Sequence, residues 1–147
     1  YVAMVAPFLL PQTHPLYSVN DVFNAIFVHG NVLGDAMFYG SGAGKLPTAS
    51  AVVADIVDIA KHLDVNIAVE WSSKKLELVD YKNMENRYFV RTTADKAAVE
   101  KVFGNVEYVV AEGVTGELGF VTGTMSEAEY AKKAEELGNV VQMIRVA

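Results

Sequence analysis

Three glycines at alternate positions, Gly40, Gly42 and Gly44, lie between an apolar stretch that ends at Tyr39 and a run of small apolar residues. Glycine accepts backbone conformations with positive φ and lets bare peptide amides come close to a flat or charged ligand. A helix that begins directly behind such a turn adds a weak positive field. The pattern therefore indicates either a turn that contacts a phosphate or planar ring, or a tight strand-to-helix turn without a ligand.

Spacing excludes two well-known glycine motifs. A P-loop has four residues between its first glycine and Gly-Lys, which Ser or Thr follows, whereas three residues separate Gly40 from Gly44, and Leu46 follows Lys45. The dinucleotide fingerprint Gly-x-Gly-x-x-Gly also differs from the spacing here, and no complete βαβ unit follows it. We interpret Lys45 as a solvated loop residue.

Other residues whose side chains could bind a metal or catalyse a reaction are interpreted as structural. His14, His29 and His62 are far apart and lack the i, i+4 pairing of helical zinc sites. Asp55 and Asp58 are one helical turn apart, a spacing that we interpret as the solvent-exposed face of a helix. The charged residues between 127 and 136 are interpreted as helix-surface pairs. We predict no catalytic residue and no metal site in this chain.

Composition narrows the class of protein. The chain has 147 residues, of which 52% are hydrophobic, so it can bury a core. A net charge of −6 argues against nucleic acid and anionic membranes as partners, and no apolar run is long enough to span a membrane. The absence of cysteine excludes disulfides and thiol catalysis. Because Tyr1 is not a normal translation start, we expect a piece of a longer polypeptide.

The elements around the glycine turn follow from the apolar pattern. Residues 2–10 predict a strand broken by Pro7, and residues 24–29 and 32–39 predict two further strands joined by a tight turn at Gly30 and Asn31.

A helix is predicted over residues 47–63, with Pro47 in its first turn and Thr48 or Ser50 as its cap. Because this helix has little polar surface, we expect it to be buried between two layers, including parts outside this chain.

The second half of the chain has a different pattern. Residues 67–84 predict a linker with one short strand at 75–79. Beyond it, alternating and amphipathic stretches predict the order βαββαβ, the ferredoxin-like arrangement. Its predicted strands are 88–93, 106–111, 118–124 and 140–146, and its helices are 95–103 and a helix capped by Ser126 and ended by Gly138. The fold class is therefore α+β.

Several of these segments resemble the carboxyl-terminal part of bacterial homoserine dehydrogenases. The resemblance lies in Asn24-Ala-Ile-Phe-Val with the upstream Thr13-His-Pro-Leu, and in Phe38-Tyr-Gly-Ser-Gly-Ala-Gly with Pro47-Thr-Ala-Ser-Ala-Val and Asp55-Ile. The region from Tyr88-Phe-Val-Arg onward resembles the regulatory ACT domain of some members. The resemblance implies the end of a catalytic and dimerisation domain over residues 1–66, a linker over 67–84 and an ACT-like domain over 85–147.

The family implies an NAD(P)-dependent oxidoreductase that interconverts L-homoserine and L-aspartate 4-semialdehyde in threonine and methionine biosynthesis. It also implies a cytoplasmic homodimer or larger homo-oligomer. The nucleotide-binding domain and the catalytic lysine of the family are missing from this chain, so we expect it to be inactive by itself. The alternative is a stand-alone ACT-type regulator that binds an amino acid.

The resemblance also implies site residues. By position, Gly44 contacts the nicotinamide end of the cofactor, with Gly42 and Ala43 beside it, while the choice between NAD and NADP stays open. In ACT domains an Asp-x-Pro-Gly run binds the effector, and the corresponding residues here run from Asp95 to Ala98. Alanine replaces both proline and glycine, which disfavours threonine as an effector and favours a role in subunit assembly.

Overall fold

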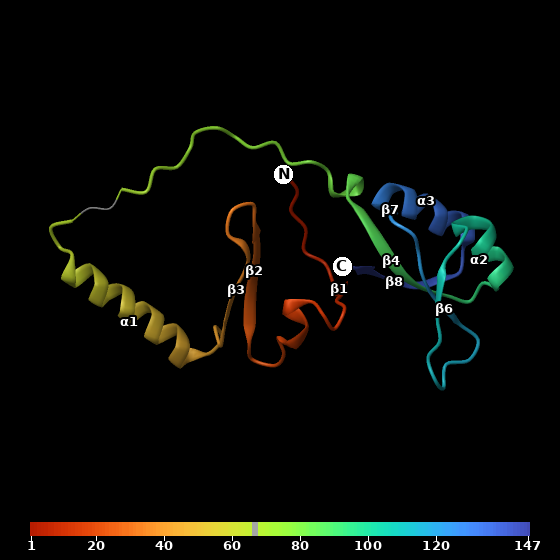
Figure 1. The fold of residues 1–147 in the computed structure, drawn as a ribbon, viewed down its shortest axis with the longest axis horizontal. Helices are drawn as coiled ribbons and strands as arrows, with labels where there is room; N and C mark the ends of the chain where they lie inside the picture. The colour runs from red at the N-terminus through yellow and green to blue at the C-terminus, as the bar shows by residue number, and fades with distance from the viewer. Residues whose placement is uncertain (66–67) are drawn as a thin grey trace. The chain divides into compact units, whose positions relative to one another are not determined.

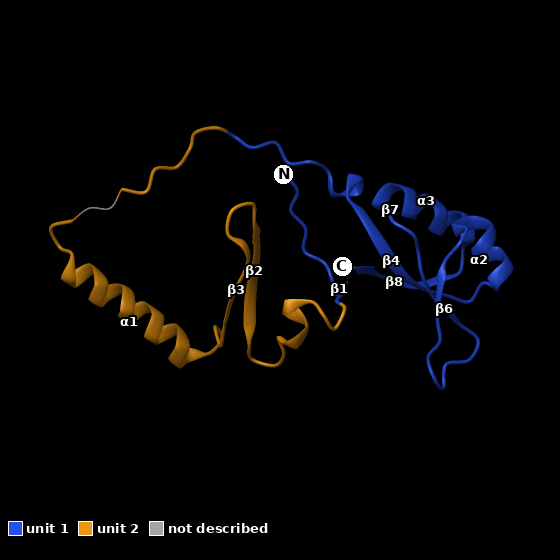
Figure 2. Cartoon of the chain, in the orientation of Figure 1, with its two compact units in different colours: residues 1–10, 75–147 blue, residues 11–74 orange. Residues whose placement is uncertain are grey.

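The computed structural model describes residues 1–65 and 68–147, which form helices and strands in both halves of the chain (Figure 1). The α+β class is thus confirmed. The chain divides into two compact units (Figure 2). Unit 1 comprises residues 1–10 and 75–147, and unit 2 comprises residues 11–74. The domain boundaries at residues 66 and 84 stay predictions.

Unit 2 contains the glycine turn. A short 3-10 helix, η1 (Pro15–Ser18), precedes β2 (Asn24–Gly30) and β3 (Gly34–Gly40), which pair antiparallel over their full length. Residues 31–33 connect the strands in place of the predicted tight turn at Gly30 and Asn31, and Gly34 at the start of β3 takes a positive φ of 77°. Helix α1 (Lys45–Lys61) follows the glycine turn.

The predicted cap of α1 is wrong. The helix begins at Lys45, with Gly44 as the N-cap, and no side chain caps it. The hydroxyl of Thr48 instead donates to the carbonyl oxygen of Gly44 at 2.9 Å, and Ser50 lies within the helix. Pro47 is tolerated because an amide in the first turn has no intrahelical partner.

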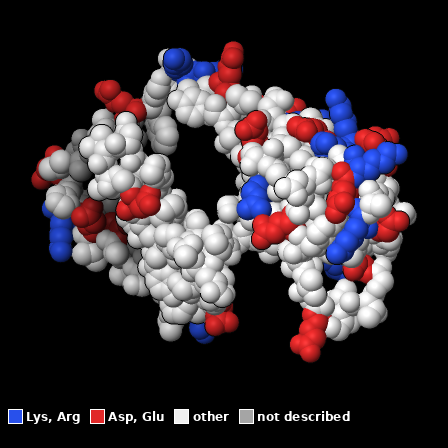
Figure 3. Space-filling view, turned by 45° about the vertical axis from the view of Figure 1, so that its right-hand side comes forward, with Lys and Arg blue, Asp and Glu red and all other residues white. Residues whose placement is uncertain are grey.

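No residue of unit 2 that the structure describes is buried. Apolar side chains are exposed on both the hairpin and the helix, for example Ile26 at 67%, Phe38 at 66% and Ile56 at 58%. Figure 3 shows broad uncharged surface on unit 2, whereas charged side chains gather over unit 1. The described residues of unit 2 therefore form no hydrophobic core of their own, and unit 2 by itself does not bury α1 as predicted.

Unit 1 has the predicted βαββαβ order. Its strands and helices are η2 (Tyr81–Asn83), β4 (Glu85–Thr92), α2 (Lys96–Phe103), β5 (Glu107–Val109), β6 (Leu118–Val121), β7 (Met125–Ser126), α3 (Glu127–Leu137) and β8 (Val140–Val146). The sheet order β8-β4-β6-β5, with every neighbour antiparallel, is that of the ferredoxin-like arrangement.

Alternation along β4 directs Tyr88, Val90 and Thr92 to one face, where all three are fully buried. Helices α2 and α3 cover that face, and the phenol ring of Tyr88 stacks on that of Tyr130 with centroids 4.5 Å apart. The opposite face, which carries Phe89 and Arg91, has no covering helix in unit 1. Unit 1 thus holds the whole described core.

The short β7 also pairs with β4, and a further strand joins this sheet from the start of the chain. β1 (Phe8–Leu9) pairs parallel with β8, and the amide of Ala147 donates to the carbonyl oxygen of Leu9 at 3.0 Å. The strand is much shorter than the predicted 2–10, because Pro7 has no amide to donate. The predicted strand at 75–79 is absent, so that prediction is wrong.

Candidate functional site

The glycine turn connects β3 to α1, and Gly44 is its most constrained residue. Gly44 has φ 108° and ψ 157°, a region of backbone space that essentially only glycine occupies. Gly40 and Gly42 do not have positive φ. Of the three glycines, only Gly44 is therefore required by the conformation of its own backbone.

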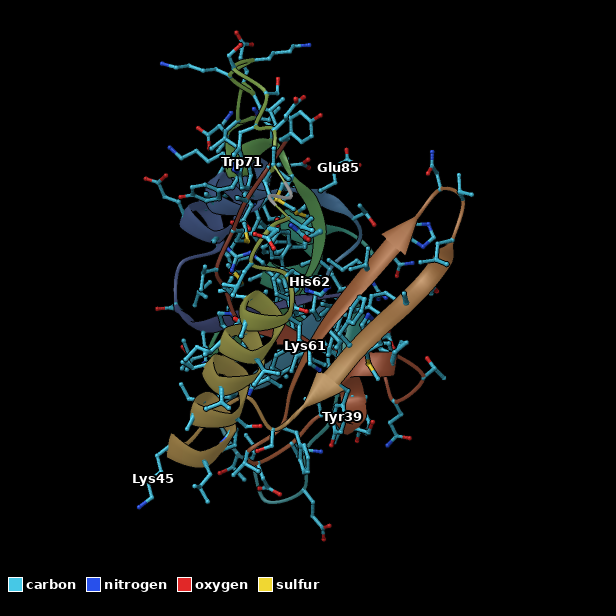
Figure 4. The ribbon with its side chains drawn as sticks, turned by 90° about the vertical axis from the view of Figure 1, so that its left-hand side faces the viewer. Tyr39, Lys45, Lys61, His62, Trp71 and Glu85 are labelled. Atoms are coloured by element: carbon cyan, nitrogen blue, oxygen red, sulfur yellow. The ribbon has the colours of Figure 1, made fainter. Side chains whose placement is uncertain are left out.

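The N-terminus of α1 presents bare peptide groups. The amide of Thr48 donates to the carbonyl oxygen of Gly44 at 3.2 Å, and Pro47 has no amide. The amides of Lys45 and Leu46 are thus the first-turn donors without an intrahelical acceptor. Lys45 itself is exposed at this end of the helix, while Lys61 and His62 mark the other end (Figure 4).

The backbone around the turn is not filled by its own chain. A Cβ atom added at Gly42 would lie 3.7 Å from Nδ2 of Asn24, and one added at Gly44 would lie 3.7 Å from Cδ of Pro47. Both distances are ordinary van der Waals contacts. The turn is therefore open enough for another molecule to approach Gly42, Ala43 and Gly44.

A shallow hollow of about 320 Å³ adjoins the turn on the hairpin. It is lined by Asn24, Ala25, Ile26, Phe38, Tyr39, Gly40, Ser41 and Gly42. The ring of Tyr39, at the end of β3 in Figure 4, stacks on Phe23 with centroids 4.9 Å apart. Apolar side chains beside bare backbone suit a planar group with polar edges better than an isolated ion.

The histidines have local partners. His14 accepts a hydrogen bond from a backbone amide two residues further on at 3.1 Å and so caps η1. His29 pairs across the hairpin with Asp35 at 2.5 Å, and His62 lies 3.4 Å from Asp58, one turn earlier. Within residues 1–65 and 68–147, no group of three or more possible metal ligands occurs.

The predicted effector residues Asp95 and Ala98 contact each other. Oδ1 of Asp95 accepts a hydrogen bond from the amide of Ala98 at 2.8 Å, so Asp95 is the N-cap of α2. This contact accounts for the aspartate without a ligand. The role of Asp95 and Ala98 in effector binding stays a prediction.

One polar pair was missed by the sequence analysis. Arg145 on β8 donates two hydrogen bonds to the carboxylate of Glu127 at the start of α3, and the two side chains are only 14% and 9% exposed. The hydrogen bond to Glu127 raises the pKa of Arg145. Glu127 is thus buried and not a surface charge. The pair joins sheet to helix within unit 1.

Comparison with known proteins finds a family match whose range includes the glycine turn. Residues 1–57 match the family described as Homoserine dehydrogenase. A homoserine dehydrogenase of Lactococcus lactis is 58% identical over 60 residues, which are 41% of this chain and 14% of the relative. One of Synechocystis is 34% identical over 156 residues, 92% of this chain and 36% of the relative.

Solved structures match both units. The chain matches a homoserine dehydrogenase from Thiobacillus denitrificans with a TM-score of 0.71 at 22% identity, over 97% of this chain and 38% of the other. It matches the Staphylococcus aureus enzyme with a TM-score of 0.65 at 26% identity, over 95% and 36%. The chain thus spans little more than a third of these proteins.

Proposed function

Because the chain belongs to the homoserine dehydrogenase family, we propose that it is the carboxyl-terminal part of such an enzyme. The complete enzyme interconverts L-homoserine and L-aspartate 4-semialdehyde with NAD or NADP, in threonine and methionine biosynthesis. The observation that carries this proposal is the backbone of Gly44, which lies inside the matched residues 1–57 and demands glycine.

The residues at the turn fit the cofactor. Gly44, with Gly42 and Ala43 beside it, would contact the nicotinamide end, because this backbone is open and the amides of Lys45 and Leu46 lack intrahelical acceptors. The nicotinamide supplies the hydride acceptor or donor when it is bound. The turn itself contributes a close backbone surface and a weak positive field.

The chain by itself is inactive under this proposal, since the residues that bind homoserine and move its hydroxyl proton lie elsewhere in the enzyme. The test is to mix the purified chain with homoserine and NADP, or with homoserine and NAD, and follow cofactor reduction by absorbance. Turnover above the level of a buffer control would contradict the proposal.

The glycine turn is tested in the complete enzyme with the variant Gly44→Ala. We expect the KM for the cofactor to rise about tenfold, equivalent to ~1.4 kcal/mol of binding, because the added Cβ forces the turn to move. The matched control is Gly138→Ala at the end of α3, where φ is 64° and ψ is 179°, so the backbone strain is similar but the location is different.

Both variants should lower the melting temperature, and only Gly44→Ala should change the cofactor KM. An unchanged KM in Gly44→Ala would mean that Gly44 is a turn residue only. Gly123→Ala, where an added Cβ has open space and φ is not positive, should alter neither quantity.

For unit 1 we propose an ACT-like module that serves subunit assembly in a cytoplasmic homo-oligomer. The support is that the carboxylate of Asp95 caps α2, so it is already engaged and is not held ready for an effector. Calorimetry with threonine should give no saturable heat. A stand-alone amino-acid-binding regulator is the alternative, but it does not explain why residues 1–57 match the family.

A further inference from the structure

A hollow of about 480 Å³ opens on unit 1 beside β5 and β6. Its lining combines apolar residues with three charged ones: Phe89, Tyr108, Val109, Val110, Ala111, Val114, Leu118 and Gly119, with Arg91, Lys96 and Glu117. The volume lies within the range of small-molecule sites, about 300–1,000 Å³. Asp95 and Ala98 do not line it, so this hollow is separate from the predicted effector residues.

Gly119 on β6 creates the floor of the hollow. It lies in register between Arg91 on β4 and Val109 on β5, on the face without helices. A Cβ at this position would lie 3.3 Å from Cε2 of Phe89 and 3.1 Å from the carbonyl oxygen of Val109. The missing side chain therefore lets the ring of Phe89 lean over the sheet and leaves an apolar surface.

The charges of the lining are not equivalent. The guanidinium of Arg91 donates to Glu117 at 2.6 and 3.0 Å, so these two charges satisfy each other. The ammonium of Lys96 lies 4.8 Å from the centre of the Tyr108 ring, and no carboxylate of the described residues forms an ion pair with it. The hollow therefore offers one cation whose charge is not balanced by an ion pair.

We propose that this hollow binds a small monocarboxylate with a branched or aromatic apolar body. The ammonium of Lys96 takes the carboxylate, and the apolar body packs on Phe89 and Val109. Because β5 is the last strand of the sheet, such a ligand reaches around its edge from the Phe89 side to Lys96 at the start of α2. Glu117 disfavours a second anionic group.

The test is an NMR titration of the whole chain with 4-methylpentanoate as the probe. We expect saturable shifts of the Gly119 and Val109 amides. Lys96→Gln should weaken binding about two- to fivefold, the usual range for an exposed ion pair. Lys101→Gln, an exposed lysine in the last turn of the same helix, should leave the affinity unchanged.

Two further ligands separate charge recognition from general apolar adhesion. The neutral 4-methylpentanamide should bind more weakly than the acid, and leucine should also bind more weakly because its ammonium repels Lys96. Absence of saturable shifts at Gly119, or equal affinity of the amide and the acid, would overturn the proposal. Tighter binding of leucine would overturn the assignment to monocarboxylates.

Discussion

Asp95 shows how one carboxylate can satisfy two interpretations of a sequence. As a helix cap, it needs only its contact with the amide of Ala98 at 2.8 Å. As an effector ligand, it would need to keep its carboxylate available. The two roles predict different behaviour in substitutions that keep or remove the capping oxygen.

We expect Asp95→Ala to lower the free energy of unfolding by about 1 kcal/mol, the usual value of an N-cap. Asp95→Ser should recover most of this loss, because the serine hydroxyl caps equally well without a charge. Urea denaturation of the chain measures both. If serine fails to rescue stability, the charge of Asp95 matters and the capping account is incomplete.

Tyr130 gives the second prediction at this scale. It is 6% exposed, and burial, with Tyr88 and Glu127 nearby, raises its pKa from 10.0 to about 12. A tyrosine is neutral when protonated, so a raised pKa means that the folded state holds this proton more tightly than the unfolded state. The contribution of Tyr130 to the free energy of unfolding is complete below pH 10 and is lost as the pH rises from 10 to about 12.

We therefore expect unit 1 to lose about 2 to 3 kcal/mol of stability across that window from this residue. Tyr130→Phe cannot ionise and should show a smaller loss, measured as the urea midpoint at several alkaline pH values. Tyr17→Phe, at a position that is 48% exposed, is the control. Equal pH profiles for the wild-type chain and Tyr130→Phe would contradict the prediction.

Single residues were predicted well where local geometry decides, and poorly where a distant partner does. The alternating glycines indicated a special backbone, and the family resemblance singled out Gly44, which is the one of the three with positive φ. It assigned the cap of α1 to Thr48 or Ser50, since polar residues commonly cap helices and the glycine N-cap leaves no side-chain signal. It treated Glu127 as a surface charge because its partner Arg145 is 18 positions away.

At the scale of elements, β1 is the most consequential strand. It belongs to the segment that matches the homoserine dehydrogenase family, yet it extends the sheet of unit 1. Besides the pairing with β8, the amide of Val79 donates to the carbonyl oxygen of Tyr1 at 2.6 Å. The start of the chain is thus attached to the ferredoxin-like sheet through backbone hydrogen bonds.

We expect Leu9→Pro to break this attachment, because proline removes an amide donor and fixes φ. The amide of Ala147, which donates to Leu9, should then exchange with solvent faster, and hydrogen exchange followed by NMR measures this directly. Val5→Pro, at an exposed position outside β1, should leave the exchange of Ala147 unchanged. Equal protection in both variants would show that the pairing does not persist in solution.

Periodicity was sufficient to predict the ferredoxin-like order, since β4 alternates and α2 and α3 each bury apolar residues on one face. It was insufficient for β1, whose two residues pair with the opposite end of the chain. The stretch 75–79 alternates like a strand but joins no sheet, since its hydrogen bond from Val79 to Tyr1 does not form a ladder. Alternation indicates a possible strand, and a partner edge decides whether it forms.

At the scale of the whole molecule, the two units differ in how they are stabilised. Unit 1 buries Tyr88, Val90, Val99 and Phe120 completely, whereas unit 2 buries no described residue. Unit 2 instead exposes large apolar side chains on its hairpin and helix. Large exposed apolar patches mark interaction sites in soluble proteins. The chain also spans little more than a third of its solved neighbours. If it is part of such an enzyme, as we propose, the remaining protein would cover α1 and the hairpin.

We expect Ile56→Asp, in the middle of α1 and 58% exposed here, to behave in opposite ways in the two contexts. In the chain alone it should change the unfolding free energy by less than about 0.5 kcal/mol and increase solubility, because surface substitutions are nearly neutral. In the complete enzyme it should cost about 2 kcal/mol or more, since a charge would be buried without a partner.

Thermal denaturation and dehydrogenase activity of the complete enzyme measure that cost, with Asp58→Ser, two residues further along α1, as the control. A complete enzyme that tolerates aspartate at position 56 would mean that this side of α1 faces water there too. The exposed apolar surface of unit 2 would then need another occupant, and the assignment of α1 to an internal layer of the enzyme would fail.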